Sequence, residues 1–69
     1  MKTFQAYDNV VVERKGKVMF GQIASVRVFS FASLLVVKYT DGEDTWFRSY
    51  YTNDSATKIE HYDPYEVYA

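Results

Sequence analysis

The sequence predicts a single all-β domain, a small barrel of about five strands. Three observations support this fold class. Residues 9–51 are dominated by Val, Ile, Phe, Tyr, Trp and Thr, which favour strands over helices. Gly, Ser, Asn and Asp recur at short intervals and mark turns between short extended segments. A chain of 69 residues has room for one hydrophobic core only, so we expect one domain over residues 1–69, with its core within about 7–62.

The turn residues divide the chain into five predicted strands. Lys15-Gly16-Lys17 and Asp41-Gly42 are expected to close two hairpins, and an Asp-Gly pair is typical of a type I′ turn. Gly21 is expected to mark a bulge or bend inside the second strand. A short Tyr-rich tail is expected to follow the barrel after Asp63-Pro64. The predicted strands are Asn9–Arg14, Val18 to about Phe29, Leu34–Thr40, Asp44–Tyr51 and Thr57–Tyr62.

Alternation within the third and fourth predicted strands indicates which residues share a face. Lys38 marks one side of the third strand as accessible to solvent, so Leu35, Val37 and Tyr39 are expected to face the core together. Large aromatic residues occur on both faces of the fourth strand. A small interior cannot hold all of them, so we expect some aromatic rings to face a partner or the C-terminal tail.

The composition narrows the class of protein. The chain has no cysteine, which excludes a disulfide-stapled scaffold and a thiolate metal site and favours a reducing, intracellular compartment. No apolar run approaches the roughly 20 residues that span a bilayer, and no signal-peptide pattern is present at the N-terminus. We therefore expect a soluble, cytoplasmic protein that has no contact with a membrane.

Enzymatic chemistry has little support in this sequence. His61 is the only histidine, and the neighbouring acidic residues are typical of an exposed surface position. With three glycines in the chain, no phosphate-binding Gly-rich loop is present. The run Asp41–Asp44 lacks the further oxygen ligands of a calcium loop and is better explained as a hairpin turn. We expect no catalysis, no metal and no cofactor.

A family resemblance rests on Gly21-Gln22-Ile23-x-x-Val26, on Val37-Lys38-Tyr39-Thr40-Asp41-Gly42 and on Trp46. This pattern resembles the Tudor and related SH3-like barrel families over about residues 7–51. The resemblance implies a five-stranded SH3-like, Tudor-like barrel that binds a partner and catalyses nothing. Function varies widely within this fold, so the partner has to be inferred from the residues of the site.

The resemblance also suggests residues for a binding site. Many Tudor domains hold a methylated cation in an aromatic cage by cation–π attraction. Glu13 and Met19 stand where this family often has further aromatic residues. With the surplus aromatic rings of the fourth strand included, we expect protein–protein recognition by a small adaptor or inhibitor. The predicted partner-binding residues are Phe20, Tyr39, Asp41, Asp44, Trp46 and Tyr50.

Two other functions remain open. The basic hairpin suggests a nucleic-acid-binding barrel, although the isoelectric point of about 5.7 is not typical of such domains. A stand-alone inhibitor of a host enzyme, of phage or mobile-element origin, would also fit a short chain that begins with Met. Self-association through strand edges is a further expectation. The predicted nucleic-acid contacts are Arg14, Lys15, Lys17 and Arg27.

Overall fold

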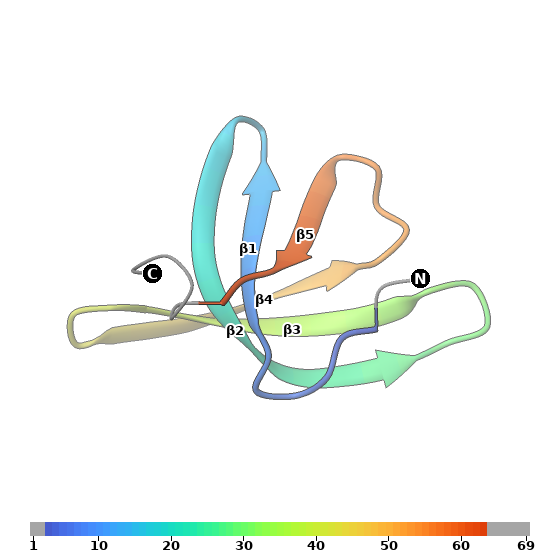
Figure 1. The fold of residues 1–69 in the computed structure, drawn as a ribbon, viewed down its shortest axis with the longest axis horizontal. Helices are drawn as coiled ribbons and strands as arrows, with labels where there is room; N and C mark the ends of the chain where they lie inside the picture. Colours follow the sequence, from blue (N-terminus) through green and yellow to red (C-terminus); the bar gives the residue numbers. More distant parts are fainter. Residues whose placement is uncertain (1–2, 64–69) are drawn as a thin grey trace.

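The computed structural model describes residues 3–63, and this range contains five strands and no helix (Figure 1). The predicted all-β class is confirmed, and each predicted strand boundary lies within one residue of the observed one. The Tyr-rich tail predicted after Asp63-Pro64, with Tyr65 and Tyr68, lies outside the described residues. The strands are β1 (Asn9–Arg14), β2 (Lys17–Val28), β3 (Ser33–Asp41), β4 (Asp44–Tyr51) and β5 (Thr57–His61).

All five strands belong to one antiparallel sheet with the order β4-β3-β2-β1-β5. Strands β1 to β4 pair with their neighbours in sequence, and β5 returns to pair with the other side of β1. Figure 1 shows the sheet strongly twisted and curled, with β5 facing back toward β4. Within residues 3–63, β4 and β5 form the two edges and do not pair with each other.

The long strand β2 joins the two halves of the sheet. Its first half pairs with β1, and its second half pairs with β3. The register shifts between Ile23 and Ser25, where Ala24 is the extra residue of a bulge. Gly21 was predicted to mark a bulge or bend, and the bulge lies three residues further along the strand.

Gly21 has a different role, because β3 passes very close to it. A Cβ atom built on Gly21 would lie 2.6 Å from Cγ1 of Val37 and 2.9 Å from the carbonyl oxygen of Lys38. No side chain fits at that distance without a backbone shift. The glycine therefore allows β2 and β3 to approach each other over the core.

The core contains the inward-facing residues of β1 to β4. The predicted inward residues of the third strand are confirmed, since Leu35, Val37 and Tyr39 are all at most 1% exposed. Phe4, Met19, Val26, Trp46 and Ile59 are partly buried and pack against this core. The fully buried set is Val10, Val12, Ile23, Leu35, Val37, Tyr39 and Tyr50.

The two hairpin turns differ in type. In the β1–β2 turn, Lys15 and Gly16 both have positive φ angles, 53° and 77°, as a type I′ turn requires. In the β3–β4 turn, Asp41 pairs with Asp44, so the central residues are Gly42 and Glu43. Only Gly42 has a positive φ, 63°, which fits a type II′ turn and corrects the predicted type I′ assignment.

Candidate functional site

Two of the six predicted partner-binding residues lie in the core. Tyr39 is 1% exposed and Tyr50 is 6% exposed, and their hydroxyl groups form a hydrogen bond of 2.9 Å. Trp46 is half-buried and stacks on Tyr39, with ring centroids 5.7 Å apart. These rings support one another inside the sheet, and in this conformation Tyr39 and Tyr50 present almost no surface to a partner.

The other predicted partner-binding residues lie at the surface but apart from one another. Phe20 is 58% exposed and contacts the ring of Tyr62, with centroids 4.8 Å apart. Asp41 and Asp44 are exposed and flank the β3–β4 turn. Phe20 follows Met19 and precedes Gly21, both of which face the core, so it projects from the opposite face of β2. The structure therefore does not gather the predicted set into one surface.

A cluster of exposed aromatic rings forms instead where β2 and β4 end and β3 begins. The rings of Phe29 and Phe31 stack with centroids 5.6 Å apart. Tyr51 lies 5.8 Å from Phe31 and 6.4 Å from Phe29. The three rings are 37%, 64% and 43% exposed in sequence order, and the adjacent Val28 is 77% exposed. We call Val28, Phe29, Phe31 and Tyr51 the aromatic end.

Backbone hydrogen bonds hold the loop of the aromatic end in place. The Phe29 amide donates to the Ala32 carbonyl at 2.8 Å. The Thr52 amide donates to the Ser33 carbonyl at 2.9 Å, and the Ser33 amide donates back to Oγ1 of Thr52 at 2.9 Å. The first bond closes the β2–β3 loop, and the other two join the start of β3 to the residue that follows β4, so the loop with its two Phe rings is held beside Tyr51.

The aromatic end borders an open cavity of about 760 Å³. Among the described residues, no charged side chain lines this cavity. Phe4, Val26, Leu35 and Ile59 contribute apolar surface beside the two Phe rings. An apolar side chain from a partner could therefore enter it without desolvating an ionised group.

The opposite end of β2 carries a second hollow, of about 320 Å³, which we call the basic pocket. Arg14, Lys15 and Lys17 reach it from the β1–β2 hairpin, and Arg48 reaches it from β4. Val12, Met19 and Tyr50 form its apolar part. Three of the four predicted nucleic-acid residues thus lie together. Arg27 does not line this pocket: it lies in the second half of β2, opposite Leu34, and is exposed.

Sequence reasoning missed Arg48 and did not identify the aromatic end as a site. Arg48 alternates with Trp46 and Tyr50, so its position on the inner face could have been deduced. Its proximity to the β1–β2 hairpin depends on the curl of the sheet, which no local pattern reveals. Phe29-Ser30-Phe31 offered a signal, because two large rings in a hairpin loop have little core within reach.

An acidic side chain lies close to the basic pocket. Hydrogen bonds from the Ala56 amide and from the Thr57 hydroxyl, at 2.9 and 3.1 Å, lower the pKa of Asp54. The nearby guanidinium of Arg14 adds a smaller effect in the same direction. Because its two oxygens accept these loop hydrogen bonds, Asp54 stabilises the turn before β5.

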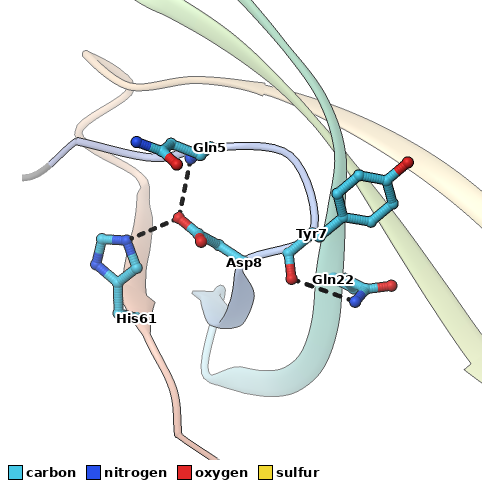
Figure 2. A network of polar contacts seen from close by, with 5 residues as sticks. All are labelled: Gln5, Tyr7, Asp8, Gln22 and His61. Carbon is cyan, nitrogen blue, oxygen red and sulfur yellow. Dashed lines mark hydrogen bonds and ion pairs between the residues drawn. The ribbon is translucent and has the colours of Figure 1, made fainter.

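His61 belongs to a polar network around the N-terminal segment (Figure 2). Its Nε2 lies 3.2 Å from Oδ2 of Asp8, which also accepts the Gln5 amide at 2.9 Å. The Gln22 side-chain amide donates to the Tyr7 carbonyl at 3.2 Å. The ring of Phe4 stacks on His61, with centroids 4.6 Å apart. These contacts fasten the N-terminal segment to β2 and β5, a structural role for the histidine.

Residues 3–63 contain no group of three His, Asp or Glu side chains placed to hold a metal ion. In the same range no helix has the length and apolar character needed to cross a membrane. Comparison of the chain with protein-family models, curated proteins and solved structures finds no match. Because no matching protein indicates a function, a functional proposal has to rest on the two hollows at the ends of β2.

Proposed function

We propose that this protein is a non-catalytic recognition module, an adaptor or inhibitor that binds another protein through the aromatic end. The observation that carries this proposal is the cluster of the stacked Phe29 and Phe31 rings with the tilted ring of Tyr51, beside a cavity that no charged side chain of residues 3–63 lines. Contiguous exposed apolar surface is uncommon on soluble proteins and marks interaction sites. Aromatic residues are enriched in the cores of protein interfaces.

The partner surface we propose is an apolar segment in extended conformation. Tyr51 ends β4, which is an edge strand within the described residues. An extended segment could pair with this edge while one of its side chains enters the cavity, as in other complexes formed by strand addition. Thr52 lines the cavity and directly follows Tyr51, the last residue of β4, so the cavity lies next to the end of the edge strand.

We further propose that the sheet is a form of the SH3-like, Tudor-like barrel. The sequential antiparallel order of β1 to β4, with β5 returning to β1, supports this. In such a barrel, the unpaired edges of β4 and β5 are surfaces to which a ligand can bind. A methyl-cation cage has less support, because Tyr39 is buried and its ring is covered by Trp46.

The proposal is tested by affinity capture from a lysate of the source organism, with nuclease added, comparing the native chain with Phe31→Ser. Phe47→Ser is the matched control, because Phe47 is 58% exposed but lies on β4 away from the cluster. A stoichiometric protein captured by the native chain and by Phe47→Ser, but at least about tenfold less by Phe31→Ser, would support the aromatic end. Equal capture by all three chains would reject it, and a second copy of this chain as the captured protein would identify self-association.

A further inference from the structure

The basic pocket is lined by four cationic side chains and by no acidic one. Arg14, Lys15, Lys17 and Arg48 line a hollow of about 320 Å³. The two ion pairs between described residues, Lys58 with Glu60 and His61 with Asp8, lie elsewhere. Within residues 3–63 none of the four cations forms a salt bridge. Four cationic side chains around one small volume form a local concentration of positive charge, which a bound anion would offset.

The chain as a whole does not explain this concentration of positive charge. Its formal net charge is −1, with nine acidic and eight basic residues. Half of all the Lys and Arg residues therefore line one hollow of a weakly acidic protein. A local positive field of this kind selects for an anionic group at a defined place.

The lining also restricts the chemical class of the anion. Guanidinium groups match phosphate oxygens in a bidentate geometry, and two of the four cations are arginines. Val12, Met19 and Tyr50 add apolar surface to the same hollow, which would suit the organic part of a ligand. The volume is at the lower end of the range for small-molecule sites, about 300–1,000 Å³.

We propose that the basic pocket binds a nucleotide unit, with its phosphate held by Arg14, Lys17 and Arg48 and its base or sugar against Met19. Such a unit could be a free nucleotide or part of a single strand, and both present the same phosphate chemistry. This site is separate from the aromatic end, since Lys17 begins β2 and Val28 ends it. A negative binding result at one site would therefore not count against the proposal for the other site.

The test measures binding of a fluorescent oligothymidylate of roughly ten nucleotides, by anisotropy, at salt concentrations from about 50 to 200 mM. Arg48→Gln and Lys17→Gln should each weaken binding about tenfold and reduce the salt slope by about 0.7. Arg27→Gln is the matched control, an exposed arginine on β2 outside the pocket, and should leave affinity within about twofold. Thermal unfolding of each variant checks that it is folded.

A second measurement separates the two sources of the ligand. Amide chemical shifts of the full chain are recorded with thymidine monophosphate, with thymidine and with inorganic phosphate. Changes in the amide chemical shifts of Lys17, Met19 and Arg48 on adding the monophosphate, but not on adding thymidine, would support a phosphate-directed site for free nucleotides. If only the oligonucleotide gives these shifts, the site belongs to single strands.

Three results would overturn the proposal. One is the absence of binding by the oligonucleotide and the monophosphate at low salt. Another is an equal loss of affinity in Arg27→Gln and Arg48→Gln, which would indicate attraction to general surface charge. The third is binding of a phosphoserine peptide at the same residues without binding of either nucleotide ligand.

Discussion

The hydroxyl groups of Tyr39 and Tyr50 form a hydrogen bond of 2.9 Å within the core. The two residues come from neighbouring strands, but they are not directly opposed, because Tyr50 pairs with Leu35 and Tyr39 pairs with Trp46. Their side chains reach toward each other along the inner face. The bond satisfies two polar groups that burial would otherwise leave without a partner, so it allows tyrosine at both positions.

Tyr39→Phe should therefore destabilise the fold by about 1–2 kcal/mol. The substitution keeps the ring but leaves the Tyr50 hydroxyl without its partner in a buried position. Urea unfolding followed by tryptophan fluorescence measures the change, since Trp46 stacks on Tyr39 and reports on this region. The control is Tyr51→Phe, whose ring is 43% exposed, and which should change stability by less than about 0.5 kcal/mol.

The double variant Tyr39→Phe/Tyr50→Phe tests the same bond by a different route. Removing both hydroxyls eliminates the unsatisfied group, so the double variant should lose less stability than the sum of the two single variants. Strict additivity would mean that the two hydroxyls act independently. In that case the hydrogen bond contributes no coupling free energy.

Alkaline pH should weaken the fold through Tyr39. Burial, and then the hydrogen bond with Tyr50, raise the pKa of Tyr39 above its ordinary value of 10.0. As pH rises through about 10, the unfolded chain loses this proton while the folded chain retains it, so the free energy of unfolding falls. Urea midpoints at pH 8 to about 11 should decline for the native chain and decline less steeply for Tyr39→Phe. Parallel declines would show that other groups cause the alkaline loss.

The strands were predictable because their signals are local. Val10 and Val12 are buried while Asn9 and Glu13 are exposed, and Asp41-Gly42 begins the β3–β4 turn, so strand boundaries followed from composition and turn chemistry. The binding site was not predictable in the same way. Tyr39 and Trp46 matched a family pattern, but the sequence alone could not show that the first ring would be buried beneath the second.

Only part of the basic pocket could be predicted from local sequence patterns. The hairpin cations Arg14, Lys15 and Lys17 are adjacent in sequence and were identified together. Arg48 joins them only because the curled sheet brings β4 back toward the β1–β2 hairpin. A bulge such as the one at Ala24 bends its strand, and its position depends on the pairing of β2 with β3 rather than on a local sequence signal.

Gly21→Ala should destabilise the protein by about 1–3 kcal/mol. The added methyl group would meet Val37 and the Lys38 carbonyl at distances that require β3 to move. Chemical denaturation measures the loss, and amide exchange of β3 should increase locally. Ser25→Ala is the control, because it changes an exposed position of the same strand and should have little effect. If Gly21→Ala left the free energy of unfolding unchanged, β2 and β3 would be able to move apart at this position without loss of stability.

Lys15→Asn should raise stability while it lowers affinity for a nucleotide ligand. Lys15 has a φ of 53°, a left-handed conformation that costs most L-residues about 1–2 kcal/mol and that Asn adopts more readily. Asn-Gly is also the preferred pair for a type I′ turn, so the substitution should gain about 1 kcal/mol. It also removes one of the four cations of the basic pocket.

Lys17→Asn is the matched control, because it removes a cation from the same pocket at a strand position without positive φ. Thermal unfolding and anisotropy titration should separate the two effects: both variants bind more weakly, and only Lys15→Asn is stabilised. If the two variants had the same stability, the left-handed conformation of Lys15 would carry no strain, and the gain expected from Asn would have no source.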